Sequence, residues 1–185
     1  MRMNPEAIGF RLMTPADLPL MHEWLNQEFV YAWYEKGPFS VEDVQAKFLP
    51  RITGEQPTRS FFITCDGCPI GYIQTYRIID YPDYSRQIEM GENVAGLDLF
   101  IGHPGYIHRG LGKHILTRFL DEIVFRMPGI TECCVGPEPE NAVAIRAYEK
   151  AGFRHLKTVT VDGELEYIMV ATRDKTRDIE EDIQP

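Results

Sequence analysis

The amino-acid sequence predicts one α/β domain in which a mixed sheet lies between two layers of helices. Its 185 residues suit a single domain of ordinary size. Hydrophobic residues make up 44% and charged residues 25%, which excludes a disordered chain, a collagen-like fibre and a disulfide-dense mini-protein. Strand-like segments alternate with helix-like segments along only part of the chain, which is typical of a three-layer fold with a mixed sheet. We expect the domain to cover residues 1–173 and residues 174–185 to form an acidic, flexible tail.

One strand and two helices are expected near the N-terminus. Phe10–Met13 reads as a strand, and Thr14, Pro15 and Asp17 after it are typical of a helix N-terminus. The apolar stripe of this helix falls on Leu18, Met21, Trp24 and Leu25. A second helix is predicted after Ser40, because acidic residues in its first turn would complement the helix dipole.

A β-hairpin, a loop and a further strand follow. Ser60–Cys65 and Pro69–Ile79 are predicted strands, since the Asp66-Gly67 dipeptide between them favours a tight hairpin turn. Residues 80–93 are rich in polar side chains, and we interpret them as a loop of a length that is often functional. The next predicted strand runs from about Val94 to Gly102.

The segment after that strand combines glycines with the start of a helix. Gly110 and Gly112 precede a helix predicted to reach about Arg126, with Leu111, Ile115, Phe119 and Ile123 on its buried face. Glycines let the backbone approach an anion, and a helix N-terminus offers free N–H groups. The pattern indicates a phosphate or pyrophosphate ligand, although a tight strand-to-helix turn explains it equally well. The spacing matches neither a P-loop nor a dinucleotide-binding fingerprint.

A short strand, a helix and a final hairpin complete the predicted domain. The strand covers Glu132–Val135, and Asn141 is expected to cap a helix that ends before Gly152. The last two strands are predicted at about Arg154–Val161 and Glu166–Thr172.

Charge and cysteine content narrow the classes of ligand. The net charge of −9 disfavours nucleic acid and favours cationic ligands, although plain solubility also explains it. Cys65 and Cys68 flank a hairpin turn, and the adjacent Cys133 and Cys134 would point to opposite faces of a strand. We therefore expect four buried free thiols and no zinc site. No apolar run is long enough to span a bilayer, and the N-terminus does not resemble a secretion signal, so a cytoplasmic location is expected.

Two motifs resemble the Gcn5-related N-acetyltransferase superfamily, namely GLDLFIGHPGYIHRGLG and, further on, ENAVAIRAYEKAGF. Gly110 and Gly112 match the glycines of its acetyl-CoA loop, Q/R-x-x-G-x-G/A. The first position of that loop is Ile107 here, which removes one polar side chain but no backbone amide. The later helix motif is matched by Asn141, Ala144, Tyr148, Gly152 and Phe153. The resemblance covers about residues 8–173 and implies a mostly antiparallel mixed sheet, acetyl-CoA as co-substrate and no metal.

Within the superfamily, the chain is most similar to the aminoglycoside 6′-N-acetyltransferases, through FRLMTPADLPLMHEWLN, IGYIQTY, GLD and AIRAYEKAGF. The resemblance implies that Asp98 is the base, that Tyr148 is the acid and that Asp83 helps to hold the drug. The position of a second carboxylate of that family is Gly136 here, with Glu138 and Glu140 nearby to supply charge. The residues expected to bind acetyl-CoA are Phe100, Ile101, His108, Arg109, Gly110, Leu111, Gly112, Lys113 and Asn141. The residues expected to bind the substrate are Trp33, Tyr34, Gln74, Asp83, Asp98 and Glu138.

The residues themselves leave alternatives open. An Asp inside an apolar strand is costly unless it is paired, so Asp98 is functional, is bound to a core Arg or His, or lies on a strand edge. Tyr148 would otherwise be a core tyrosine with a bonded hydroxyl, and Trp33 and Tyr34 an ordinary packed pair. The implied reaction is direct attack of an amine, without an acyl-enzyme. Other possible amine substrates are a siderophore hydroxylysine, a polyamine or a protein N-terminus, and a non-catalytic acyl-CoA-binding module is the alternative from another class. A monomer and a homodimer are both compatible with the sequence.

Overall fold

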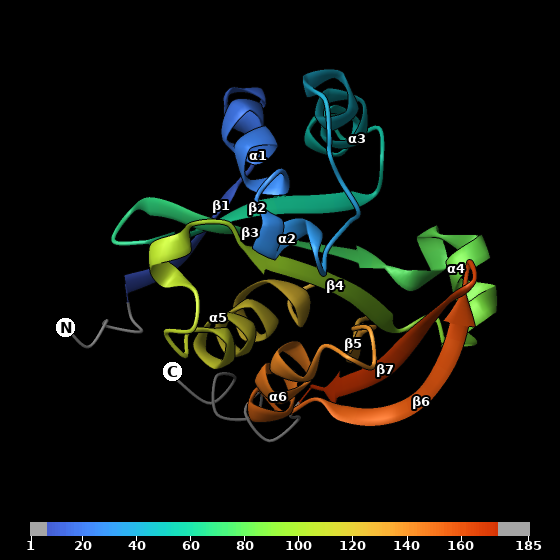
Figure 1. Cartoon of the computed structure of the whole chain (residues 1–185). Helices are drawn as coiled ribbons and strands as arrows, with labels where there is room; N and C mark the ends of the chain where they lie inside the picture. The colour runs from blue at the N-terminus through green and yellow to red at the C-terminus, as the bar shows by residue number, and fades with distance from the viewer. Residues whose placement is uncertain (1–6, 174–185) are drawn as a thin grey trace, which may run out of the picture.

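The computed structural model describes residues 7–173 and contains one seven-stranded sheet in the order β1-β2-β3-β4-β5-β7-β6 (Figure 1). Neighbouring strands are antiparallel except for β4 and β5, which run parallel. The expected mixed, mostly antiparallel sheet is therefore confirmed. The strands are β1 (Ile8–Leu12), β2 (Thr58–Cys65), β3 (Cys68–Arg77), β4 (Val94–Ile101), β5 (Glu132–Val135), β6 (Arg154–Val161) and β7 (Glu164–Thr172).

Helices cover both faces of the sheet, as expected. Figure 1 shows α1 and α3 on one face and α5 and α6 on the other. The α-helices are α1 (Leu18–Leu25), α2 (Glu28–Tyr31), α3 (Val41–Thr53), α4 (Pro82–Ile88), α5 (Gly112–Phe119) and α6 (Ala142–Lys150). A π-helical turn, Leu120–Val124, continues α5.

Local signals in the sequence explain where several of these elements begin and turn. Ser40 caps α3: its hydroxyl accepts a hydrogen bond from the Asp43 backbone N–H at 3.1 Å, and its own N–H donates to the Asp43 carboxylate at 2.8 Å. Asp66 and Gly67 have φ values of 49° and 78°, as a two-residue hairpin turn requires. These boundaries follow from contacts within a few residues, so they were predictable.

Four expectations about the elements are wrong in detail. Residues 80–93 include helix α4, because Pro82 opens a turn whose Ile88 is buried against neighbouring apolar residues. The first strand begins at Ile8, and the helix after Gly112 passes into the π turn before residue 126. Cys68 is exposed, because it follows the hairpin turn directly, whereas the other three thiols are buried. The expected tail, residues 174–185, lies outside the described residues.

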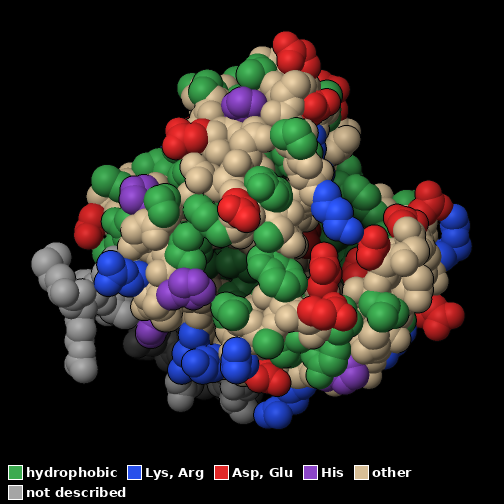
Figure 2. All heavy atoms as spheres, viewed as in Figure 1, with side chains coloured by type: hydrophobic (Ala, Val, Ile, Leu, Met, Phe, Trp, Pro, Cys, Tyr) green, Lys and Arg blue, Asp and Glu red, His purple; other side chains and the backbone are tan. Residues whose placement is uncertain are grey.

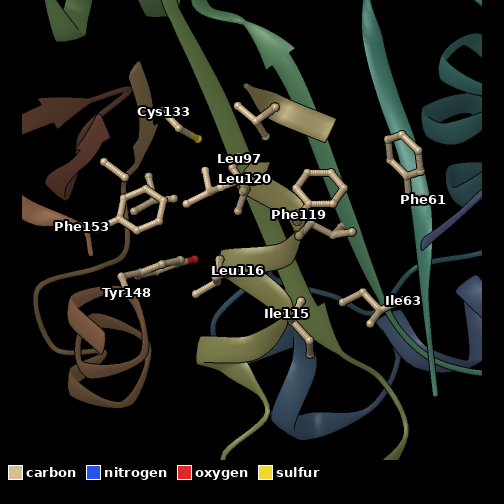
Figure 3. Packing of buried hydrophobic residues seen from close by; sticks show 14 of the residues in the cluster. Phe61, Ile63, Leu97, Ile115, Leu116, Phe119, Leu120, Cys133, Tyr148 and Phe153 are labelled. Carbon is tan, nitrogen blue, oxygen red and sulfur yellow. The ribbon is translucent and has the colours of Figure 1, made fainter. Parts of the chain in front are cut away.

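Two cores hold the layers together. On one face, Ile115 and Phe119 of α5 pack against Phe61 and Leu97 of the sheet, and Tyr148 of α6 closes the side of this core (Figure 3). On the other face, α1 and α3 bury Met21, Trp24, Leu25, Val44 and Phe48 against Phe62, Tyr72 and Phe100. Each buried large apolar side chain contributes about 1.5–3 kcal/mol to folding. The sheet is thus a rigid support whose central strands present side chains to both layers.

Candidate active site

The candidate active site lies where β4 and β5 separate. Their parallel pairing covers only Val94–Gly96 and Glu132–Cys134, whereas β4 continues to Ile101 beside β3 alone. The backbone groups of residues 97–101 on the β5 side are therefore not used by sheet pairing. A strand edge of this kind, in the middle of a domain, can hydrogen-bond to an extended ligand.

The glycine-containing loop forms one end of this opening. His108 and Gly110 have φ values of 58° and 73°, and α5 begins at Gly112. A Cβ added at Gly110 would have no neighbouring atom within 4 Å, so the backbone here faces open space. The side chains of Arg109 and Lys113 beside it are exposed. Free N–H groups at a helix N-terminus, open space and two cations fit an anionic ligand such as a pyrophosphate.

Asp98 lies near the middle of β4, on the face that also carries Phe100. Gln74 of β3 donates from Nε2 to Asp98 Oδ2 at 2.7 Å. Burial raises the pKa of Asp98, and the hydrogen bond from Gln74 and the charges of Arg51 and Lys47 oppose that rise. Among residues 7–173, no Lys, Arg or His forms an ion pair with Asp98. The core ion pair left open by the sequence is therefore not what holds this carboxylate.

Gln74 connects Asp98 to helix α3. Its Oε1 accepts hydrogen bonds from Arg51 Nη1 at 2.8 Å and from the Tyr72 hydroxyl at 2.7 Å. The Tyr72 hydroxyl also lies 2.8 Å from that of Ser60. The side chain of Gln74, which is expected to bind the substrate, thus makes hydrogen bonds inside the protein. No motif in the sequence marks Arg51 or Tyr72 as part of the site.

Aromatic side chains line the same face. Tyr34 packs against Phe100 with ring centroids 4.8 Å apart and lies under the ammonium of Lys47, 5.8 Å from the ring centroid. Trp33 is 49% exposed, so its ring is available for stacking. Burial lowers the pKa of Lys47 to about 8, and the nearby Arg51 acts in the same direction. Figure 2 shows a hollow lined by hydrophobic side chains near the centre of this view, with acidic side chains grouped beside it.

Glu166 of β7 places a carboxylate over Gly136. A Cβ added at Gly136 would overlap Glu166 Oε2, so a larger residue there would require this carboxylate to move. The Tyr84 hydroxyl donates to Glu166 Oε2 at 2.9 Å. Burial raises the pKa of Glu166, the Tyr84 hydrogen bond opposes the rise, and the negative charge of Asp98 adds to it. The two carboxylates are therefore close enough to influence each other, and no ion pair neutralises Glu166 within residues 7–173.

Tyr148 approaches from the opposite face of the sheet. Asn141 Oδ1 accepts from the Ala144 backbone N–H at 3.1 Å, which caps α6 and orients the face that carries Tyr148. Figure 3 shows the tyrosine pointing from α6 toward Leu116. Burial and the charge of Asp98 raise the pKa of its hydroxyl. That hydroxyl has no hydrogen-bond partner among residues 7–173. It is also not among the fully buried polar atoms, so it remains accessible to solvent. It is not the bonded core tyrosine of the plainer interpretation.

The remaining expected site residues are spread more widely. Asp83 lies on α4, where it is exposed and paired with Arg86. Glu138 is half-buried in the segment after β5. The Phe100 side chain lies on the Asp98 face and that of Ile101 on the α5 face, so these two can meet a ligand at the β4 edge only through their backbone. Leu111 is buried under α5. The structure thus brings Asp98, Gln74 and Tyr34 together and leaves Asp83 apart from them.

Glu166 was missed because its signal is weak. It alternates with Ile168 and Val170, so an acid occupies a position of the inward face, but a strand end tolerates such a residue. Its relation to Gly136 depends on how β5 and β7 pair, with Val135 opposite Met169. No pattern within either strand encodes that contact.

Two general features bear on ligands. Within residues 7–173, no three His, Cys, Asp or Glu side chains are placed to hold a metal ion together. No helix in the same range has the length and apolar character needed to cross a membrane.

Comparison with known proteins gives consistent results. The model of the acetyltransferase (GNAT) domain family matches residues 14–161. The chain is 35% identical over 180 residues to aminoglycoside N(6′)-acetyltransferase type 1 of Klebsiella pneumoniae, covering 94% of this chain and 89% of the relative. The enzyme of the same name from Serratia marcescens is 36% identical over 171 residues, covering 91% and 84%.

Solved structures agree with the sequence comparison. The structure of AAC(6′)-Ib with parmomycin and acetyl-CoA has a TM-score of 0.82 at 32% identity and covers 96% of this chain and 98% of that one. The structure of the same protein with coenzyme A and kanamycin has a TM-score of 0.82 at 33% identity, covering 94% and 99%.

Proposed function

The chain belongs to the acetyltransferase (GNAT) domain family, and from that premise we propose that it transfers acetyl from acetyl-CoA to the 6′-amine of aminoglycosides, which confers resistance to these antibiotics. The observation that carries the proposal is Asp98, a half-buried carboxylate beside the opening between β4 and β5 that has no ion pair among residues 7–173. A partly desolvated charge of this kind is costly unless a ligand of opposite charge completes the site. An aminoglycoside amine, which is protonated at neutral pH, supplies that charge.

The opening between β4 and β5 is the proposed acetyl-CoA site. The backbone of residues 108–112 would hold the pyrophosphate at the start of α5, with Arg109 and Lys113 adding positive charge. The free edge of β4 at Phe100 and Ile101 would bind the pantetheine arm and polarise the thioester carbonyl. Asn141 lies at the start of the neighbouring helix, and its amide nitrogen is not used by the cap.

Asp98 is the proposed base. It would attract the substrate ammonium, orient it and accept its proton, directly or through a water molecule. The raised pKa of Asp98 suits this role, because a carboxylate of ordinary pKa is a weak base for an amine. The resulting neutral amine attacks the acetyl carbonyl directly.

Tyr148 is the proposed acid and would protonate the departing thiolate. It reaches the opening from the α6 side of the sheet, whereas Asp98 reaches it from the side covered by α1 and α3. In this proposal the proton donor and the base would approach the thioester from different sides of the sheet. A free thiol has a pKa of about 8.5, so the leaving group needs only modest assistance.

Glu166 is the proposed second carboxylate for the drug. The family carboxylate expected at position 136 is absent, and Glu166 fills that space from the adjacent strand. Together with Asp98 it would engage two amines of one polycation, while Trp33 and Tyr34 would contact the sugar rings. Glu138 and Asp83 would add charge at the rim. The reaction would take place in the cytoplasm, and the protein would act as a monomer or a homodimer.

A CoA-release assay tests the function. Matched aminoglycosides with an amine or a hydroxyl at 6′ are compared, and mass spectrometry with NMR locates the acetyl group. We expect turnover only with the 6′-amine. Turnover of spermidine or a peptide N-terminus in place of aminoglycosides would favour the other amine substrates, and binding of acetyl-CoA without turnover of any amine would favour a non-catalytic module.

A further inference from the structure

The hydrogen-bond partners of Gln74 fix the orientation of its side-chain amide. An arginine side chain can only donate, so the atom of Gln74 that faces Arg51 Nη1 must be the carbonyl oxygen Oε1. The Tyr72 hydroxyl donates to the same oxygen. The amide nitrogen is therefore turned the other way and donates to Asp98 Oδ2, which has to accept. The orientation of the amide follows from its partners, and an ionised carboxylate is the acceptor that suits it.

We propose that Gln74 is a positioning residue: held by Arg51, it donates to Oδ2 of Asp98 and fixes the carboxylate in its ionised form for the substrate amine. This inference rests on the proposed function and deepens it. A direct ion pair between Arg51 and Asp98 would neutralise the carboxylate and compete with the substrate ammonium. Gln74 lies between Arg51 and Asp98 and keeps the guanidinium from pairing directly with the carboxylate. The charge of Arg51 therefore still favours the ionised form of Asp98, and the carboxylate stays available to the substrate.

Among the titratable and charged groups that face Asp98, Arg51 is the cation best suited to keep the carboxylate ionised. The acidic or neutral titratable groups that feel its charge come from five elements and from the segment after α2: Tyr72 and Tyr76 of β3, Tyr84 of α4, Cys133 and Cys134 of β5, Tyr148 of α6, Glu166 of β7 and Tyr34. The cations that lower the pKa of Asp98 are Arg51 and Lys47, both from α3, and a hydrogen bond from Tyr76 acts in the same direction. Lys47 is ion-paired with Glu35, and burial lowers its own pKa to about 8. Arg51 stays charged over the whole working range.

Gln74→Glu is the decisive variant. It keeps the size of the side chain, but a carboxylate cannot donate, so the introduced carboxylate would pair with Arg51 and place a like charge beside Asp98. We expect the acidic limb of the kcat/KM profile for the aminoglycoside to move up by about one pH unit or more. The KM for acetyl-CoA should not change. Arg51→Met should move the limb in the same direction, and Arg51→Lys should restore part of the shift.

A measurement without turnover keeps the inference separate from the proposed function. Carbon-13 NMR of labelled aspartate carboxyls in the full chain follows the titration of Asp98, identified by the signal missing in Asp98→Asn. The midpoint should rise in Gln74→Glu and Arg51→Met. Arg59→Met is the matched control, because that guanidinium lies exposed over Phe61, on the α5 side of β2. It should leave the midpoint unchanged.

The outcomes are distinct. An unshifted midpoint in folded Gln74→Glu and Arg51→Met overturns the positioning role, even if the enzyme acetylates aminoglycosides. If the variants lose thermal stability or turnover without a shift of the acidic limb, the hydrogen bonds of Arg51, Gln74 and Asp98 are purely structural. That result also overturns the positioning role. A shifted midpoint in a protein that acetylates no aminoglycoside supports the network and removes the proposed substrate instead.

Discussion

The half-buried carboxylate of Asp98 destabilises the fold when it is ionised, although the proposed reaction needs that form. Its pKa in the folded protein is raised above the ordinary value of 3.8, so the folded state binds the proton more tightly than the unfolded chain does. The protonated form of Asp98 therefore contributes favourably to the free energy of unfolding at low pH. This contribution is lost as the pH rises from 3.8 through the raised value, where the ionised form is disfavoured by burial.

Asp98→Asn should therefore stabilise the fold while it abolishes most activity. We expect the variant to have the larger free energy of unfolding at pH 7, with the difference shrinking as the pH approaches 3.8, measured by urea unfolding across pH. Its kcat/KM for the aminoglycoside should fall by about a hundredfold or more. Asp83→Asn, on the exposed end of α4, is the control, and an equal loss of activity there would remove Asp98 from its central role.

Glu166→Gln should weaken the binding of polycationic substrates. The amide can still accept the Tyr84 hydrogen bond, so the change removes the charge with little change in packing. We expect KM for a drug with several amines to rise about tenfold, which corresponds to about 1.4 kcal/mol, with acetyl-CoA kinetics unchanged. Glu122→Gln removes the same charge on the α5 side, and a similar rise of KM there would point to net charge alone.

Tyr148→Phe should slow the chemical step modestly. The ring keeps its packing against Phe153, with centroids 5.5 Å apart, so stability and acetyl-CoA affinity should survive. General acids typically contribute about 10²–10⁴-fold, and thiolate departure lies at the low end. Single-turnover kinetics measure the effect, which should shrink with a thioester of a more acidic thiol. A wild-type rate would make water the proton donor.

At the scale of elements, a comparison of valine variants at Gly110, just before α5, and at Gly54, after α3, distinguishes backbone strain from ligand binding. Gly110 and Gly54 both have positive φ, 73° and 83°, and open space around a Cβ, but Gly54 ends α3 far along the chain. Valine should strain both turns similarly. Gly110→Val should weaken CoA binding at least tenfold in calorimetry, about 1.4 kcal/mol or more. Gly54→Val should leave CoA affinity unchanged. If the two folded variants bind CoA equally well, the pyrophosphate does not bind at this loop.

At the scale of the whole molecule, the net charge of −9 should attract the substrate. Attraction between exposed charges is screened beyond about 10 Å at 0.1 M salt. We therefore expect kcat/KM for a drug with several amines to fall as sodium chloride rises, and to fall less for an analogue with fewer amines. Equal salt dependence for the two would show that the field of the protein has no part in substrate capture.

Much of the architecture was predictable from local signals. The capping pattern at Ser40 and Asp43, the turn at Asp66 and Gly67, and the cap of α6 at Asn141 depend on residues at most three positions apart. Apolar periodicity likewise assigned the buried faces of α1 and α5. Helix α4 was missed because it spans only seven residues and is stabilised by burying Ile88 rather than by a pattern of its own.

The sequence by itself determined the family motifs, the glycine loop and the two side chains proposed for proton transfer. The tertiary structure alone decided their surroundings: Arg51 behind Gln74, and Glu166 over Gly136. Each of these contacts joins residues 23 or more positions apart. They depend on strand register and on how α3 and β7 lie against the sheet. Hydrogen bonding and burial act through space, so residues without a local pattern can set the ionisation of a carboxylate whose own position was evident from the sequence.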